Sequence, residues 1–144
     1  MKRLLLLMVI VFSVHCSIFA ASDQTNRIFL YQNERRSGKT NVWWLTGEKL
    51  KTLETWDARK EKVPLSLDRA IEIASKWIDS RESGKCQIEK ITIKPIRSGE
   101  GRLSRIFYYQ FDFYATRMFD FAACIVLMDG TVLEPETHYL RLPP

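Results

Sequence analysis

Residues Arg105–Tyr114 read RIFYYQFDFY, and the chemical character of the side chains alternates along this stretch. Successive side chains of a strand point to opposite sides of a sheet. One side of this stretch is wholly aromatic, and the other side mixes aromatic, aliphatic and polar groups. The alternation predicts a strand with one buried face and one amphipathic face. The aromatic side consists of Phe107, Tyr109, Phe111 and Phe113.

Further strands are predicted on both sides of this stretch. Gln87–Ile96 (QIEKITIKPI) alternates before it, and the proline within it predicts an edge strand, because proline cannot donate to a ladder. Ala122–Met128 follows and is almost wholly apolar, which indicates a central or covered strand. Asp129-Gly130 then precedes the apolar Thr131–Leu133, and Asp-Gly between apolar flanks is a strong hairpin signal. We therefore expect an antiparallel sheet of three to four strands, with Asp129 as a corner.

One helix is predicted before these strands. Ser66 is a good N-cap, because its hydroxyl can accept a hydrogen bond from an unpaired amide of the first turn. Asp68 suits the positive end of the helix dipole. Apolar residues then recur at the spacing of one helical face, which predicts a stripe that covers the sheet. The stripe consists of Leu67, Ala70, Ile71, Ala74, Trp77 and Ile78.

The first 22 residues predict a secretory signal peptide. Lys2 and Arg3 precede the unbroken apolar run Leu4–Phe12, which is far shorter than the roughly 20 residues of a membrane-spanning helix. Cys16 could in principle accept a lipid, but His15 stands where the lipoprotein pattern has a small residue, and this disfavours lipidation. We expect a secreted or periplasmic protein that keeps no stable membrane anchor after cleavage. An uncleaved anchor is the alternative.

The remaining 122 residues suit one domain with one core. Only Lys2 and Arg3 are lost with the leader, so 20 basic and 17 acidic residues leave a net charge of +3. Proteins that bind nucleic acid usually show a strongly basic face, so we expect no nucleic-acid partner.

The remaining chain offers few groups for catalysis or metal binding. His138 is its one histidine and lies in a polar tail, and only two cysteines remain, which excludes a His-rich or four-cysteine zinc site. The motifs of nucleotide-binding loops, serine-hydrolase elbows and zinc proteases do not occur. We expect a protein that is not an enzyme and that uses no metal or cofactor.

Aromatic residues outside the predicted core face are candidates for an interaction surface, or for a cover that the N-terminal segment supplies. These residues are Trp43, Trp44, Trp56, Tyr108 and Tyr114.

Cys86 and Cys124 could form a disulfide in an exported protein. In a simple meander, however, one strand separates them, and their Cα atoms lie about 10 Å apart at two inter-strand spacings. A disulfide requires less than about 7 Å. The bond is therefore expected only if the two strands are neighbours or if Cys86 curls over the sheet.

Two stretches resemble PepSY-type domains. Val63–Ala74 (VPLSLDRAIEIA) resembles the opening of these domains, and Ile125–Glu134 (IVLMDGTVLE) resembles their closing V-x-x-DG-x-V strand pair. The resemblance implies a small exported module without catalytic activity. Some PepSY-type domains lie in protease propeptides and act as inhibitors or folding aids. A similar helix-on-sheet layout occurs in cystatin-like folds, and the sequence does not separate the two.

Together these patterns predict an α+β fold, with one main amphipathic helix packed on an antiparallel sheet of three to four strands. Before the sheet we expect an N-terminal extension with two short strands, at Arg27–Tyr31 and Asn41–Leu45. The expected function is an exported non-catalytic binding module, protease-inhibitory or regulatory by resemblance, whose partner is an envelope or secreted protein. The alternative is a small-ligand-binding protein that uses a cleft between helix and sheet. The expected divisions are a signal peptide at 1–22, the extension at 23–63, a PepSY-like domain at 64–136 and a tail at 137–144.

Overall fold

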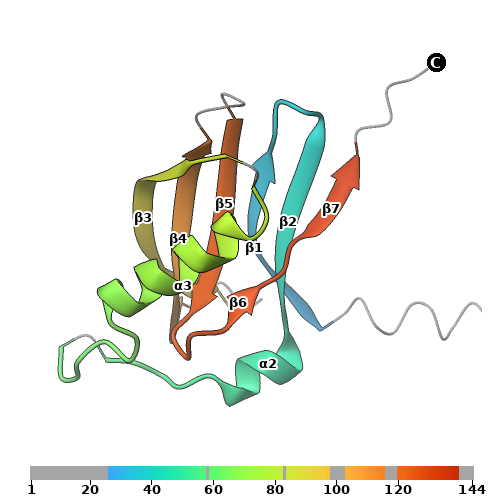
Figure 1. The fold of residues 1–144 in the computed structure, drawn as a ribbon. Coiled ribbons are helices and arrows are strands. Elements are labelled where there is room, and N and C mark those ends of the chain that lie inside the picture. Colours follow the sequence, from blue (N-terminus) through green and yellow to red (C-terminus); the bar gives the residue numbers. More distant parts are fainter. Residues whose placement is uncertain (1–25, 58, 83, 98–102, 116–119, 140–144) are drawn as a thin grey trace, which may run out of the picture.

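The strands in the described part of the chain form two antiparallel sheets (Figure 1). The computed structural model describes residues 26–57, 59–82, 84–97, 103–115 and 120–139. Strands account for 52% of the structure and helices for 19%, so the sheets dominate the fold. The predicted signal peptide with Cys16, and a turn predicted at 98–102, lie outside the described residues.

Sheet A contains three strands in the order β1-β2-β7. β1 (Arg27–Glu34) pairs with β2 (Lys39–Thr46), and β2 pairs with β7 (Glu136–Tyr139). Gly38, in the turn between β1 and β2, has a φ of 75°, a conformation that glycine adopts without strain. Sheet A therefore combines the segment expected to be an extension with residues expected in the C-terminal tail.

Sheet B contains four strands in the order β3-β4-β5-β6. These are β3 (Cys86–Arg97), β4 (Leu103–Ala115), β5 (Asp120–Leu127) and β6 (Val132–Leu133). β3 lies at an edge, as its proline predicted, and the β3–β4 register shifts next to that proline.

The predicted Asp-Gly hairpin joins β5 to β6. The Leu127 amide donates to the Thr131 carbonyl at 2.8 Å, and the Gly130 amide donates to the Leu127 carbonyl at 2.9 Å. The loop between Leu127 and Thr131 thus has three residues, and its last residue, Gly130, has a φ of 85°. Asp129 accepts hydrogen bonds from the Thr131 amide at 2.9 Å and from Lys49 Nζ at 2.6 Å. It is a corner residue that also ties the hairpin to a neighbouring helix.

Two helices are described, α2 (Gly47–Thr52) and α3 (Leu67–Asp79). Ser66 caps α3 as predicted, because its Oγ accepts from the Arg69 amide at 3.4 Å. α3 packs against β5 through alanines with 0% exposure, so helix and sheet approach closely. Within the described part of the chain, no helix has the length and the apolar run that a membrane crossing needs.

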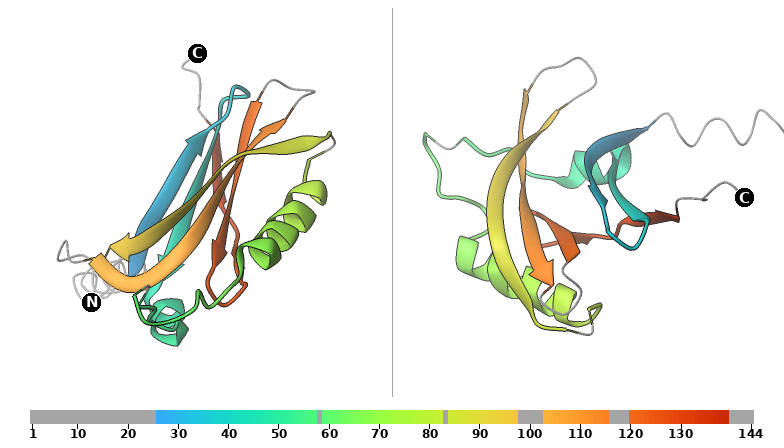
Figure 2. Two further views of the ribbon diagram at one scale, coloured as in Figure 1. Left: turned by 90° about the vertical axis from the view of Figure 1, so that its left-hand side faces the viewer. Right: turned by 90° about the horizontal axis from the view of Figure 1, so that it is seen from above.

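Sheet B is covered on both faces (Figure 2). α3 covers one face, and sheet A covers the other. The core on the α3 side includes Tyr109, Phe111, Phe113, Cys124 and Val126. The core between the sheets includes Trp43, Leu45, Tyr108, Ile125 and Leu127. Alternate residues of β5 enter opposite cores, which explains its almost continuous apolar sequence.

The predicted fold class is wrong. We expected one main helix on one sheet, but the described chain has two sheets and only short helices. The physical reason is that β4 and β5 present apolar groups on both faces, and one 13-residue helix covers only one of them. Sheet A covers the second face, so residues on both sides of the expected boundary at residue 63 share one core.

Candidate functional site

The five aromatic residues predicted as a surface do not lie together. Trp43 is 0% exposed and donates from Nε1 to the Leu133 carbonyl at 3.1 Å. Tyr108 is 3% exposed and donates from its hydroxyl to the Leu30 carbonyl at 3.2 Å. The structure corrects the surface prediction for these two residues, because both lie in the core between the sheets. Trp43 is part of the cover that the N-terminal segment supplies.

The other three predicted aromatics are partly exposed and lie in separate places. Trp44 lies on the outer face of sheet A, with the Arg27 guanidinium 5.1 Å from its ring centre. Trp56 packs edge-on against Phe107, with ring centres 5.2 Å apart. Tyr114 contacts the ring of Phe121, at a centre distance of 5.5 Å. None of the three is among the described residues that line the cleft below, but Tyr114 contacts Phe121, which does line it.

Cys86 and Cys124 are free thiols. β4 separates their strands, and Cys86 pairs with Ala115 whereas Cys124 pairs with Phe111, so they are also offset along the strands. This geometry agrees with the distance argument against a disulfide. Burial raises the pKa of Cys124 to about 12, so its thiol stays protonated at neutral pH.

His138 is exposed on β7, opposite Thr40 of β2. Over the ranges described by the structure, no three His, Cys, Asp or Glu side chains gather so that they could hold a metal ion. The candidate site is therefore sought in the shape and polarity of the surface.

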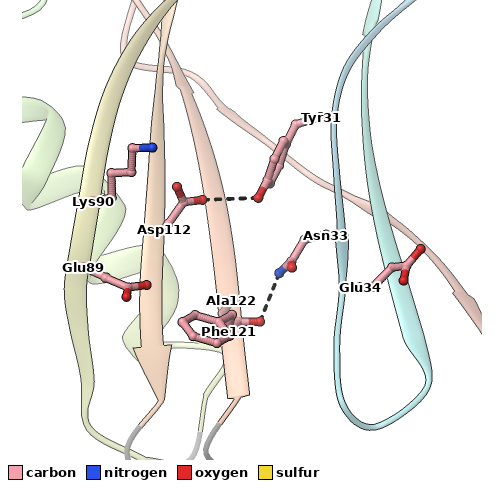
Figure 3. Close-up of a pocket in the computed structure, with 8 residues that line it drawn as sticks. All are labelled: Tyr31, Asn33, Glu34, Glu89, Lys90, Asp112, Phe121 and Ala122. Atoms are coloured by element: carbon pink, nitrogen blue, oxygen red, sulfur yellow. Dashed lines mark hydrogen bonds between the residues drawn. The ribbon is translucent and has the colours of Figure 1, made fainter.

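An open cleft of about 450 Å³ lies between β1 and sheet B (Figure 3). Inward-facing residues of β1 form one wall, and residues of β3, β4 and β5 form the other. The lining residues of the cleft are Tyr31, Asn33, Glu34, Glu89, Lys90, Asp112, Phe121 and Ala122.

A chain of hydrogen bonds links the two walls. The Tyr31 hydroxyl donates to Asp112 Oδ1 at 3.4 Å, and Gln110 Nε2 donates to both Asp112 oxygens at 2.9 and 3.1 Å. Lys94 Nζ donates to Gln110 Oε1 at 2.7 Å and lies 5.4 Å from the centre of the Tyr31 ring. Burial and the neighbouring Asp112 raise the pKa of Tyr31, so its hydroxyl remains a donor. This network holds the side chains of Tyr31 and Asp112 in place.

Phe121 forms the apolar part of the cleft wall. Its side chain is 43% exposed, and its carbonyl accepts from Asn33 Nδ2 at 3.0 Å, which ties β5 to β1. Glu89 extends toward the cleft from a register shift in β3, whereas Glu34 points away from it (Figure 3). The cleft therefore combines one exposed ring with acidic, basic and amide groups.

A largely buried ion cluster lies at the end of this wall. Arg35 Nε donates to Asp120 at 2.8 Å, and its Nη1 donates to Glu82 at 2.7 Å. Asp120 is 3% exposed and also accepts from the backbone amides of Arg36 at 3.1 Å and Phe121 at 2.9 Å. The cluster joins the β1–β2 turn, the segment after α3 and the start of β5. It fixes the positions of the residues next to it in the cleft.

We predict that this cluster makes stability depend on acid pH. Burial acts to raise the pKa of Asp120, but hydrogen bonds from Arg35 and the Arg36 amide outweigh it and hold that pKa below its ordinary value. Such a carboxyl stabilises the fold above its unfolded pKa, about 3.9, and the contribution is lost as pH falls through the folded value. Urea unfolding midpoints from pH 7 to pH 3 should decline less below about pH 4 in Asp120→Asn than in the wild type. Equal declines would contradict this assignment.

The sequence contained one local signal for the cleft. Gln110 and Asp112 are polar residues on the face of β4 that also carries Tyr108, and polar groups on a covered face need hydrogen-bond partners. No local signal pointed to Tyr31 or Phe121. Tyr31 meets Asp112 across 81 residues of sequence, so only the packing of the two sheets brings them together.

Comparison of the chain with protein family models, with curated proteins and with solved structures found no match to any of them.

Proposed function

We propose that this chain is an exported, non-catalytic binding module, and that its cleft contacts another protein of the envelope or the medium. The observation that carries the proposal is the exposed ring of Phe121, 43% accessible beside fixed polar groups. Exposed aromatic rings that fill a partner's pocket are typical anchors of protein interfaces. Tyr114 packs against this ring, and Asn33 donates a hydrogen bond to the Phe121 carbonyl. Phe121 is therefore already ordered, and binding would cost little conformational entropy there.

The polarity and openness of the cleft favour a protein over a small molecule. Sites for small molecules are concave and lined mainly by apolar groups, with only a few polar ones. Six of the eight described lining residues are polar or charged, and among these eight Phe121 is the one large side chain without a polar group. Interfaces between proteins combine an aromatic centre with a polar rim, which is the composition seen here.

The alternative function, a small-ligand site between helix and sheet, has less support. Ala70 and Ala74 of α3 are 0% exposed, so the helix packs closely on sheet B. The cleft of about 450 Å³ lies between the two sheets instead. A ligand-binding function would have to use that cleft, and the test below includes this outcome.

The resemblance of Val63–Ala74 and Ile125–Glu134 to PepSY-type domains adds one expectation. PepSY-type modules in protease propeptides act as inhibitors or folding aids, so a secreted hydrolase is the first class of partner to examine. In this proposal the module inhibits or regulates such an enzyme by covering its surface.

The proposal predicts that Phe121→Ala strongly reduces partner capture. The chain from Asp23 onward, which contains every described residue, is immobilised and exposed to the envelope and secreted fractions of the producing organism. Bound proteins are then quantified by mass spectrometry. Because an anchor residue contributes about 2 kcal/mol or more, capture of the specific partner should fall by at least about tenfold in Phe121→Ala. A captured hydrolase would then be titrated with the module to measure inhibition.

Phe29→Ala is the matched control. Phe29 is 52% exposed, but it lies on the outer face of sheet A, away from the cleft lining, so its removal should leave capture unchanged. Equal capture by the Phe121→Ala and wild-type chains would refute the cleft as the interface. A second outcome favours the ligand-binding alternative. In that outcome no protein is enriched, and a low-molecular-weight extract raises the melting temperature of the wild type but not that of Phe121→Ala.

A further inference from the structure

A second, smaller groove opens where β6 and β7 part. β6 pairs with β5 only at Ile125 and Val126. The chain then leaves sheet B and pairs with β2 in sheet A, beginning with Glu136 opposite Val42 (Figure 1). The first half of β5 is therefore left without a strand neighbour on its β6 side in the part of the chain that the structure describes.

The backbone of Ala123 faces this open side. The Leu127 amide and carbonyl both bond toward the β6 side, to Thr131 and Gly130. In an antiparallel ladder, alternate residues direct both backbone groups to the same side, so Ile125, Ala123 and Phe121 follow Leu127. The Phe121 carbonyl bonds to the Asn33 side chain, which agrees with this alternation. Ala123 lies between these bonded positions and is only 3% exposed.

Pro135 explains why β6 does not continue along β5. The register pairs Ile125 with Leu133, so the next residue to face Ala123 in the same ladder would be Pro135. Proline has no N–H and cannot donate to the Ala123 carbonyl. A buried backbone amide and carbonyl without a ladder partner are unfavourable, and an added strand would satisfy both.

The groove beside Ala123 has a volume of about 210 Å³, and its charged and aromatic lining residues are Arg35, Lys39, Arg81, Glu82, Trp77 and Tyr139. Arg35 is already paired with Glu82 and Asp120. Arg81 pairs with Glu134 and lies over the Trp77 ring, at 4.6 Å from its centre. Lys39 differs from Arg81, because no carboxylate among the described residues forms an ion pair with it. Its Nζ lies 5.5 Å from the Tyr139 ring centre. The charge still available to a ligand is therefore positive.

We propose that this groove binds an extended, acidic segment of a partner polypeptide. The segment adds to the open edge of β5 through a backbone bridge to Ala123, and it places a carboxylate near Lys39. One bridging residue suits the small volume of the groove, so the contact is short and specific for an extended backbone. The inference does not depend on the cleft between β1 and sheet B, because it rests on different residues.

The test is an NMR titration of the ¹⁵N-labelled chain from Asp23 onward. The probe is the pentapeptide N-acetyl-Thr-Glu-Val-Glu-Thr-amide, and the comparison peptide has lysine in place of both glutamates. The acidic peptide should shift the Ala123 amide downfield and slow its hydrogen exchange. It should bind about fivefold more tightly than the basic peptide, as expected for one partly exposed ion pair. Methylation of the backbone nitrogen that bridges to Ala123 should abolish the shift.

Two variants separate the groove from other sites. Lys39→Ala should weaken the acidic peptide about fivefold, whereas Lys51→Ala, an exposed lysine of α2, should leave its affinity unchanged. Pro135→Ala supplies the missing N–H, so β6 should extend to Ala123 and peptide binding should fall. The proposal is overturned if the Ala123 amide does not respond, if both lysine variants weaken binding equally, or if Pro135→Ala binds as the wild type does.

Discussion

Replacing Trp43 with alanine is expected to lower the free energy of unfolding by about 3–5 kcal/mol. The indole is 0% exposed and lies between the two sheets, where it contacts the core residues of β5. Its removal leaves a large cavity and frees the Leu133 carbonyl that accepts from Nε1. Urea denaturation followed by far-UV circular dichroism measures the change.

Two control variants test whether this cost comes from the burial of the Trp43 ring. Trp44→Ala removes the same atoms from the outer face of sheet A and should cost less than about 1.5 kcal/mol, because Trp44 is only partly buried. Trp43→Phe keeps a ring in the core and loses the indole donor, so its cost should be about 1–3 kcal/mol. Similar costs for Trp43→Ala and Trp44→Ala would mean that sheet A does not pack on sheet B as described.

The second large effect is expected at Arg35. Arg35→Met should destabilise the fold by about 3 kcal/mol, because it leaves the buried carboxylate of Asp120 without its cation. Glu82 loses its partner at the same time, although its side chain is 14% exposed and partly reaches water. The measurement is the urea midpoint at pH 7, where the Asp120 carboxyl is charged because its pKa is lowered.

The neighbouring arginine is a matched control for this effect. Arg36 contributes only its backbone amide to Asp120, and its side chain is exposed, so Arg36→Met should change stability by less than about 0.5 kcal/mol. Combining Arg35→Met with Asp120→Asn should recover part of the loss, since position 120, the more deeply buried of the two acidic sites, then carries no unpaired charge. A double variant as unstable as the sum of both single variants would show that the two residues do not act as a pair.

Local patterns predicted individual elements well. The cap at Ser66 and the hairpin at Asp129-Gly130 depend on neighbouring residues, and the edge position of β3 follows from the chemistry of proline. The two faces of Arg105–Tyr114 also divide as the alternation indicated. These features are short-range, so the sequence alone carries the information.

The second sheet could not be predicted in the same way. The adjacent indoles of Trp43 and Trp44 point to opposite faces, and nothing in NVWWL shows which one is buried. β7 is short, polar and exposed, and it is held by its backbone pairing with β2 rather than by an apolar pattern. The useful signal was the apolar sequence of β5, which predicted a central or covered strand, and the structure shows that both faces of this strand are buried.

The cleft and the groove both follow from this missed packing. Tyr31 and Asp112 come from different sheets, and the groove opens because the chain crosses from sheet B to sheet A after Pro135. The sequence analysis predicted one main sheet, so it could not predict a cleft between sheet A and sheet B. The candidate sites are thus consequences of long-range contacts rather than of motifs.

Native-state hydrogen exchange of the hydrogen-bonded amides in β2 and β5 tests the central claim most directly. If sheet A and sheet B share one core, the amides of both strands should exchange only through global unfolding, with opening free energies that agree within about 1 kcal/mol. A β2 that opens several kcal/mol more easily than β5 would contradict the account. Sheet A would then be an appended layer, and neither the cleft nor the groove would persist as a binding site.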